Sequence, residues 1–242
     1  MTELRVIPLE GMPEVEEGAD LGALVAAAAR LEDGDVVVVA QKIVSKAEGR
    51  VARLEDVEPS DLARQLAADQ DPRRLEVVLR EAARIVRSRP PLVIAETRHG
   101  LVCASAGVDA SNAPEPGLLV LLPIDPDESA RRLRDRLREL TGRTVGVVVS
   151  DSFGRPWRQG TTDIAIGSAG ILTLLDLRGR RDRAGYELHA TEIAVADEIA
   201  GAAELVMGKT NGVPGAVVRG LDLAGEGTAR ELVMPPERDL FR

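Results

Sequence analysis

The sequence predicts an α+β or mixed α/β fold, in which mixed sheets are flanked by helices. Short apolar runs rich in β-branched residues indicate buried strands, and Ala-rich or charged segments that follow capping residues indicate helices. The two kinds of segment do not alternate in strict strand–helix–strand order, which argues against a purely parallel sheet. With 242 residues, 44% of them hydrophobic, the chain is long enough for one large domain or for two intertwined lobes that share an interface.

The first half of the chain combines short strands with capped helices. Asp20 can cap an Ala-rich helix that runs to about residue 31. Ser60 and the pair Asp71-Pro72 mark two further helix starts, because the first turn of a helix does not need the N–H that Pro lacks. Strands are predicted at residues 4–8, 36–40, 92–96, 101–104 and 118–122, the third and fourth forming a hairpin.

The second half contains the clearest helix and the least regular segment. Asp125-Pro126 opens a strongly charged helix over residues 128–140, and Thr141-Gly142 ends it. Residues 151–187 are rich in Gly and Arg but keep short apolar runs, which indicates a long functional segment with short strands. The remaining predictions are strands at 145–149 and 216–219, and a helix at about 191–205.

Composition excludes several classes of function. The net charge is −9 and aromatic residues make up 2%, so neither overall attraction to nucleic acid nor base stacking is expected. No apolar segment is long enough to span a membrane. The single Cys103 excludes an intrachain disulfide and a cysteine-based zinc site, and it suits a reducing compartment. We therefore expect a cytoplasmic protein that binds neither nucleic acid nor membrane.

Two acidic segments lie where predicted strands end. Asp109 follows the predicted hairpin, and Ser150-Asp151-Ser152 follows the strand at 145–149. Acids in such positions can converge as hard oxygen ligands for Mg²⁺ or Mn²⁺, with water and phosphate oxygens completing the octahedron. Each Asp, taken alone, also fits the role of a turn or cap residue.

Three basic segments accompany these acids. Residues 154–160 contain Arg155 and Arg158, and arginine forks bind phosphate and carboxylate at two points. A second arginine cluster at 178–183 also fits a solvated loop whose charges pair with nearby acids. Residues 41–50 follow a buried strand, where a lysine either contacts phosphate as a point charge or lies in a surface turn.

The tripeptide Gly208-Lys209-Thr210 resembles the end of a phosphate-binding P-loop, but the full pattern fails. It requires a glycine where this chain has Ala203, and it requires a strand before and a helix after, the reverse of the prediction here. We reject this interpretation. A Gly-rich turn from helix to strand can still offer backbone N–H groups to a nucleotide, although a helix C-cap explains Gly208 equally well.

Four motifs, taken together and in order, resemble those of the coenzyme F420-0:L-glutamate ligases. They are VAQKIVSKAEG at 39–49, AGVDASN at 106–112, SDSFGR at 150–155, and ADEIA at 196–200 followed by Met-Gly at 207–208. The resemblance extends from Pro8 to about Gly227. Several long motifs in the right order make it far more specific than any one of them.

The resemblance implies a GTP-dependent ligase that joins L-glutamate to coenzyme F420-0, a deazaflavin, and often lengthens a γ-linked glutamate tail. It implies a mixed α/β fold specific to the family, Mg²⁺ or Mn²⁺ together with K⁺, and a homodimer with a cleft near the dimer interface. A single ligase domain is expected over residues 1–242, with a smaller lobe within about residues 151–190. Some relatives carry a C-terminal flavin-dependent reductase domain, which is not expected here.

The resemblance also implies roles for individual residues. Asp109 and Asp151 would hold metal with Ser152 nearby, and both acids would act in catalysis with Lys46 and Arg155. Lys209 stands where some relatives have an acid that contributes to a second metal, so the second metal is left open. The residues expected around GTP are Met12, Pro13, Glu14, Val15, Gln41, Lys42, Lys46, Asn112, Met207, Gly208, Lys209, Thr210, Asn211, Gly212, Val213 and Pro214.

The chemistry of amide ligation agrees with these residues. A carboxylate and an amine do not condense in water without activation, and transfer of the γ-phosphoryl group to the coenzyme carboxylate would give a reactive acyl phosphate. The spread charge on that group calls for metal and cationic side chains rather than a protein nucleophile. Two alternatives remain: an amide ligase for another acidic acceptor, and a nucleotide- and metal-binding module without turnover, which the intact Asp109, Asp151, Lys46 and Arg155 disfavour.

Overall fold

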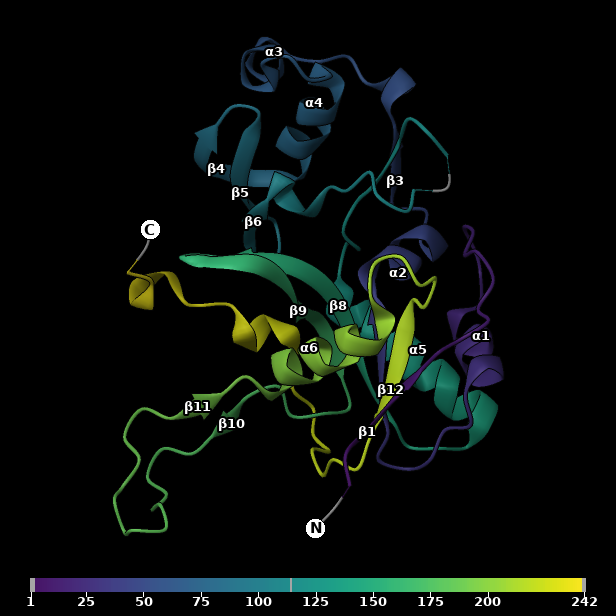
Figure 1. The fold of residues 1–242 in the computed structure, drawn as a ribbon, viewed down its shortest axis with the longest axis vertical. Coiled ribbons are helices and arrows are strands. Elements are labelled where there is room, and N and C mark those ends of the chain that lie inside the picture. Colours follow the sequence, from purple (N-terminus) through teal and green to yellow (C-terminus); the bar gives the residue numbers. More distant parts are fainter. Residues whose placement is uncertain (1–2, 114, 241–242) are drawn as a thin grey trace.

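Five strands form the central sheet, in the order β1-β12-β2-β8-β9 (Figure 1). The computed structural model describes residues 3–113 and 115–240. β2 and β8 run parallel, whereas the other neighbouring pairs are antiparallel. The predicted class, with mixed sheets flanked by helices, is confirmed. The strands are β1 (Arg5–Pro8), β12 (Gly215–Arg219), β2 (Val36–Ala40), β8 (Gly146–Arg155) and β9 (Arg158–Ala169).

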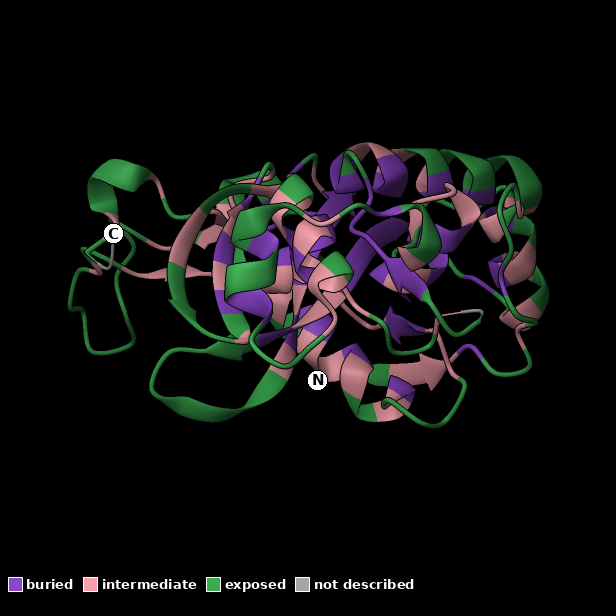
Figure 2. Ribbon diagram, turned by 90° about the horizontal axis from the view of Figure 1, so that it is seen from above, coloured by how far each residue is buried: buried purple, intermediate pink, exposed green. Residues whose placement is uncertain are grey.

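Helices cover both faces of this sheet, which explains why β2 is an unbroken apolar run. Successive side chains of a strand point to opposite faces. Val37 and Val39 therefore join one core cluster, together with residues of α1 and α5, while Val36 and Val38 join another that includes α6. The buried residues gather in this layered centre (Figure 2). The helices are α1 (Leu21–Ala28), α2 (Gln41–Ala47), α5 (Pro126–Thr141) and α6 (Val195–Met207).

A second unit is inserted between α2 and α5, and we call residues 51–120 the small lobe and the remainder the main lobe. The small lobe has a core cluster of its own, which includes Leu66, Leu75, Val93 and Leu119. Its elements are β3 (Val51–Arg53), α3 (Asp61–Ala67), α4 (Pro72–Glu81), β4 (Ala82–Arg89), β5 (Leu92–Thr97), β6 (Val102–Ala104) and β7 (Leu118–Val120).

Residues 151–190, within which a smaller lobe was expected, form the outer part of β8, the whole of β9 and an exposed arm. The arm carries the short strands β10 (Leu175–Asp176) and, just beyond residue 190, β11 (Glu192–Ile193), which pair with each other. It projects away from the central sheet (Figure 1). No helix in residues 3–113 or 115–240 combines the length and the apolar character that a membrane span requires.

The predicted helix boundaries depend on capping side chains, and these are confirmed. Asp20, Ser60, Asp71 and Asp125 each accept a hydrogen bond from a backbone N–H in the first turn of α1, α3, α4 and α5. Gly142 ends α5 with a φ of 69°, a left-handed conformation that suits glycine.

Three elements differ from the prediction, each for a physical reason. β8 runs to Arg155 rather than ending at 149, because backbone pairing with β9 extends it beyond the core, where no burial pattern marks the residues. β4 was not predicted, because its side chains are largely exposed and do not alternate. The segment after β2 is helix α2 rather than a surface turn; Ala40, its N-cap, offers no capping side chain.

Candidate functional site

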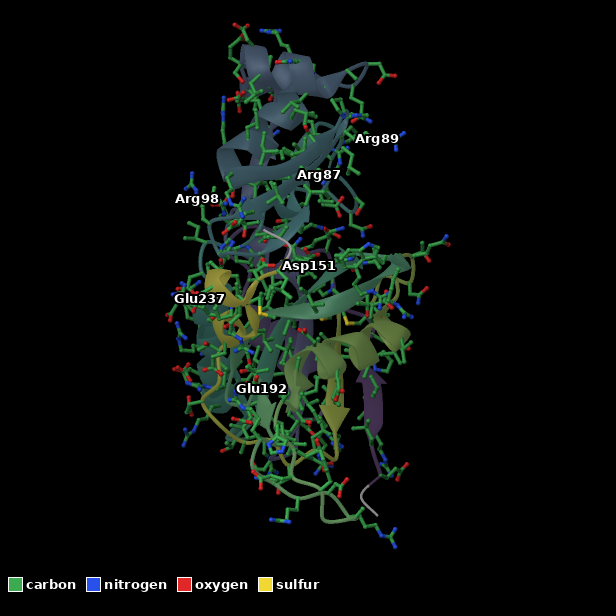
Figure 3. The ribbon with its side chains drawn as sticks, turned by 90° about the vertical axis from the view of Figure 1, so that its left-hand side faces the viewer. Arg87, Arg89, Arg98, Asp151, Glu192 and Glu237 are labelled. Carbon is green, nitrogen blue, oxygen red and sulfur yellow. The ribbon has the colours of Figure 1, made fainter. Side chains whose placement is uncertain are left out.

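The candidate site lies where β2 ends and its parallel pairing with β8 stops. Ala40 is aligned with Ser150 in the register, so Gln41 and Asp151 follow at the same edge of the sheet. The carboxyl ends of parallel strands are where ligands commonly bind in sheets of this kind. In Figure 3, Asp151 lies at the level where the small lobe, marked by Arg87 and Arg98, meets the main lobe.

A cavity of about 400 Å³ opens at this edge, a volume within the range of small-molecule sites. All of the residues expected around GTP line it except Asn211, and the predicted metal-site residues Asp151 and Ser152 line it as well. Five further residues complete the lining, none of them predicted to have a role at the site: Ala40, Ile43, Ser150, Asp163 and Glu204.

The cavity contains every lysine of the chain. Of the 31 Lys and Arg residues only three are lysines, Lys42, Lys46 and Lys209, and all three line this cavity. A lysine ammonium is a compact point charge that suits phosphate, whereas arginine serves the rest of the surface. This restriction to three positions is visible in the sequence and is the signal that identifies the cluster.

Each of these lysines contacts a carboxylate from a different segment. The ammonium of Lys46, a residue only 7% exposed, donates to Glu14 of the turn before α1. Lys42 Nζ lies 2.7 Å from Asp109 Oδ2. Lys209 Nζ lies 3.9 Å from Oδ1 of Asp163 on β9.

Asp109 is held in a tight loop of the small lobe. Its carboxylate accepts hydrogen bonds from the backbone N–H of Ser111 at 2.7 Å and from the Ser111 hydroxyl at 2.9 Å. Burial acts to raise the pKa of Asp109, but hydrogen bonds from Lys42 and Ser111 outweigh it and hold the pKa below its usual value. Positive φ angles at Ala106 (51°) and Asn112 (54°) show a constrained backbone of the kind that clusters at functional sites.

Asp151 has the opposite electrostatic character. Burial raises the pKa of this carboxyl to about 7, and the charge of Asp163 adds to the effect, while the backbone N–H of Ser152 and the charges of Lys209 and Lys42 oppose it. Asp163 is buried and accepts hydrogen bonds from the hydroxyls of Ser150, at 3.0 Å, and Ser152. A buried carboxylate with this pKa gains from a nearby cation.

The donor set fits a divalent cation such as Mg²⁺ or Mn²⁺. Within the described part of the chain, no three His, Cys, Asp or Glu side chains are grouped as a ready metal site. Mg²⁺ commonly binds through one or two carboxylates, keeping water and substrate phosphate as its other ligands. Asp109, Asp151 and the Ser152 hydroxyl supply such a partial set beside three phosphate-suited lysines.

Three predicted residues lie outside the cavity lining, and one of them, Asp109, stands beside it through its contact with Lys42. Arg155 is at the exposed end of the β8–β9 hairpin, outside the cavity lining, and its guanidinium reaches the carbonyl of Gln159 at 3.5 Å. Asn211 belongs to the turn after α6, and its amide lies against Gly208. The catalytic role of Arg155 therefore stays a prediction.

Other interpretations of single segments are settled by placement. α6 precedes Gly208 and β12 follows the turn, so the rejection of a P-loop is confirmed, and Gly208 is the C-cap of α6. In the 178–183 cluster, Arg178 pairs with Asp176 at 2.6 Å on the exposed arm, as the solvated-loop alternative expects. Cys103 is buried, and desolvation raises the pKa of its thiol to about 12, with the Asp151 charge adding to it.

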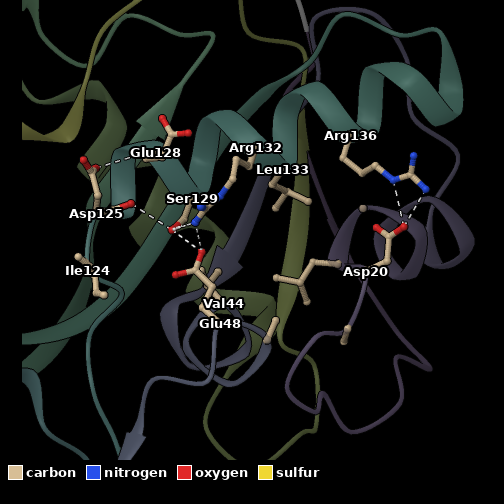
Figure 4. Close-up of a pocket in the computed structure, with 14 residues that line it drawn as sticks. Asp20, Val44, Glu48, Ile124, Asp125, Glu128, Ser129, Arg132, Leu133 and Arg136 are labelled. Atoms are coloured by element: carbon tan, nitrogen blue, oxygen red, sulfur yellow. Dashed lines mark hydrogen bonds and ion pairs between the residues drawn. The ribbon is translucent and has the colours of Figure 1, made fainter.

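A larger cavity of about 630 Å³ lies between α1, α2 and α5 (Figure 4). None of the predicted site residues lines it. Its charged groups are largely satisfied by one another: Glu48 accepts from Arg132 and from the Ser129 hydroxyl, both at 2.6 Å, and Arg136 pairs with Asp20 at 2.8 Å. These contacts fasten α2 and α1 to α5, which gives this groove a structural role.

Known proteins that are similar to this chain share one description. The family model described as "F420-0:Gamma-glutamyl ligase" matches residues 11–220. A coenzyme F420:L-glutamate ligase of Methanopyrus kandleri is 49% identical, over 99% of this chain and 98% of the relative. The proteins of the same name from Archaeoglobus fulgidus and Methanothermobacter thermautotrophicus are 45% and 43% identical, each over 99% of this chain and over 96% and 99% of their own lengths.

Proposed function

Because the chain belongs to the F420-0:gamma-glutamyl ligase family, we propose that it joins L-glutamate to coenzyme F420-0 at the expense of GTP. The observation that supports this most is the cavity beyond β2 and β8, where the three lysines meet two acids suited to a metal. Relatives that carry the name of this activity match nearly the entire chain.

In this proposal the lysines position the nucleotide phosphates. Lys42 and Lys46 lie on α2 directly after β2, and Lys209 lies on the turn between α6 and β12. Three ammonium groups from two segments can hold a chain of phosphates from more than one side. The turn at residues 207–214 adds backbone N–H groups, which bind phosphate when they point into one concavity.

The acids complete the arrangement. Asp109, Asp151 and Ser152 would hold Mg²⁺ or Mn²⁺. We propose that the reaction also uses K⁺, as the resemblance to the family implies. A divalent ion held by these residues would neutralise charge on the transferred phosphoryl group. Asp163 fixes the hydroxyls of Ser150 and Ser152 beside Asp151, so the orientation of Ser152 is set before any ligand binds.

The proposed reaction has two steps. A carboxylate oxygen of the coenzyme attacks the γ-phosphorus of GTP, forming an acyl phosphate and releasing GDP. The amine of glutamate then attacks the carbonyl carbon, and inorganic phosphate leaves as the amide bond forms and the amine loses its proton. No covalent bond to the protein is needed, which is consistent with the buried, protonated Cys103.

The direct test is mass spectrometry of the deazaflavin after incubation with the protein, GTP, Mg²⁺ or Mn²⁺ and L-glutamate. We expect a mass gain of one or more glutamyl residues, with GDP and phosphate released in equal amounts. Glutamate addition that continues undiminished in excess EDTA would rule out the metal, and equal turnover with ATP would rule out dependence on GTP.

The same assay separates the two alternatives. If other acidic acceptors gain glutamate while the deazaflavin does not, the chain is an amide ligase of different specificity. If GTP binds but no acceptor is extended, it is a binding module. The proposed homodimer is tested by light scattering of the purified protein, where the mass of one chain, 25.8 kDa, would contradict it.

A further inference from the structure

Lys42 pairs with Asp109, one of the two acids that the proposed function assigns to the metal. Its Nζ lies 2.7 Å from Asp109 Oδ2 and also contacts the Ser111 hydroxyl. The Lys42 side chain is only 14% exposed. The Lys42 ammonium thus stands beside a carboxylate where a divalent cation is proposed to bind.

The other two lysines are placed differently. Lys46 contacts Glu14, whose side chain is 65% exposed, and the side chain of Lys209 is itself 56% exposed. Neither of their carboxylate partners, Glu14 and Asp163, is a proposed metal ligand. Only Lys42 both neutralises a proposed metal ligand and lines the space proposed for phosphate.

The balance of charge in and around the cavity explains why this matters. Five carboxylates face three ammonium groups, so a polyphosphate meets net negative charge until cations are added. They are Glu14, Asp109, Asp151, Asp163 and Glu204 against Lys42, Lys46 and Lys209. If the Lys42 ammonium turns away from Asp109 towards phosphate, that carboxylate loses its charge partner, which is costly unless another cation takes the place of the ammonium.

We propose that Lys42 is the built-in counter-ion of Asp109, and that it gives up this place when a divalent cation binds, so that its ammonium becomes available to the nucleotide phosphate. The inference rests on the proposed function, because it assumes the metal at Asp109. Lys42 belongs to the main lobe and Asp109 to the small lobe, so the exchange removes a direct ion pair between the two lobes. Coupling of this kind is reciprocal: metal favours nucleotide, and nucleotide favours metal.

Mn²⁺ binding without nucleotide tests the competition, measured by electron paramagnetic resonance of the free ion. We expect Lys42→Met to bind Mn²⁺ roughly tenfold more tightly than the wild type, because the ion no longer displaces a charge-assisted contact. Lys46→Met is the matched control on the same helix, and its Mn²⁺ affinity should change much less. Equal affinities for the two variants would overturn the proposal, because general loss of positive charge would then explain any gain.

Amine footprinting of the wild type gives an independent readout that does not depend on a variant folding. Only three side chains can react, so brief acetylation followed by mass spectrometry resolves each lysine. Acetylation of Lys42 should rise when Mg²⁺ or Mn²⁺ is added alone and fall when GTP is also present. Lys46, whose partner Glu14 is not a proposed metal ligand, should not respond to metal alone.

Asp109→Asn supplies the complementary control, since Lys42 should then react readily without metal and be insensitive to it. If acetylation of Lys42 in the wild type does not change when a metal binds, the exchange is wrong but the proposed function still stands. Failure of the wild type to bind Mn²⁺ at all overturns the metal in the proposed function and the exchange with it.

Discussion

The ammonium of Lys209 contacts the hydroxyl of Ser152 and lies 3.9 Å from Oδ1 of the buried Asp163. Three segments meet in this contact: the turn after α6, the outer part of β8, and β9. Some relatives have an acid at the position of Lys209, and that acid contributes to a second metal. This chain instead has a single positive charge there.

We predict that Lys209 does part of the work of a second metal ion. Lys209→Ala should raise the KM for GTP or lower kcat by an amount that corresponds to one charge-assisted contact, about 1.5–3 kcal/mol. Lys209→Glu should be worse at low metal but partly rescued by Mn²⁺, because the new acid can bind an ion. Steady-state kinetics across a metal titration are the measurement. Two variants that match the wild type at every metal concentration would make Lys209 a plain surface residue.

Asp109→Asn and Asp151→Asn should each abolish most activity while the fold survives. Both side chains lie at the cavity rather than in a hydrophobic cluster, so losing one charge leaves the core intact. Turnover at limiting Mg²⁺ and circular dichroism are the two measurements. Near wild-type turnover in either variant would remove that acid from the set of ligands.

The stability of the metal-free protein should depend on pH through Asp151. The folded state holds its proton up to a pKa of about 7, against an ordinary value of 3.8, so the unfolded state loses the proton first. The free energy of unfolding therefore falls as pH rises between these values, by at most about 4 kcal/mol. In EDTA, Asp151→Asn should raise the melting temperature at pH 8 and have no effect near pH 4.

Asp176→Asn is the control for that experiment. The hydrogen bonds from Arg178 lower the pKa of Asp176 to about 2, so its contribution has the opposite sign. That contribution is present above the unfolded pKa and is lost as pH falls through the folded one. Asp176→Asn should give no stabilisation at pH 8; a gain equal to that of Asp151→Asn would point to overall charge instead.

Arg155 should act on the coenzyme rather than on GTP, because it lies outside the nucleotide cavity. Arg155→Ala is expected to raise the KM for the deazaflavin and leave GTP binding unchanged. The single Trp157, 83% exposed in the same hairpin end, gives an optical readout, since a deazaflavin bound there should quench its fluorescence. Arg178→Ala on the distant arm should be silent, and equal losses in both variants would contradict a specific role.

Asp35 and Arg219 should form the ion pair that matters most to stability. Both Asp35 oxygens accept from the guanidinium at 2.8 Å, and Asp35 is 1% exposed. Asp35→Asn should cost about 3 kcal/mol in urea unfolding, because it breaks an ion pair whose acid is fully buried and leaves Arg219 with the more exposed Glu32. Glu3→Gln breaks the exposed pair with Arg5 and should cost under about 1 kcal/mol. Similar values for the two variants would contradict the assignment.

Local signals allowed much of the fold to be predicted. The valine run of β2 is an apolar surface that must be buried, which marks it as a strand. At Asp20 and Asp125, a side-chain oxygen can accept hydrogen bonds from helix N–H groups, which marks the start of a helix. β4 carries neither signal. Its pairing with β5 depends on the small-lobe core on the other side of the sheet, which is visible only once the chain is folded.

The residues of the candidate site were also predictable only where a local signal in the sequence marked them. Lys42 and Asp151 were predictable because each directly follows a buried strand, and residues just beyond parallel strands converge. Asp163 was not, because it lies within a strand among polar neighbours. Only the register that sets Asp163 opposite Ser152 on β8 brings it to the cavity. Its role arises from pairing between strands rather than from any motif.

The position of the small lobe has a consequence for the order of folding. β2 and β8 pair in the main sheet although the whole small lobe separates them in the sequence. Closing so long a loop costs conformational entropy, and this cost slows folding. Within the small lobe, β4, β5 and β6 pair between sequence neighbours, and Val51 at its beginning meets Val120 at its end. Once formed, the lobe holds the chain ends that lead to β2 and β8 close together. The folded lobe thus keeps the two flanking segments in position, and we expect the main sheet to be completed only after the lobe has assembled.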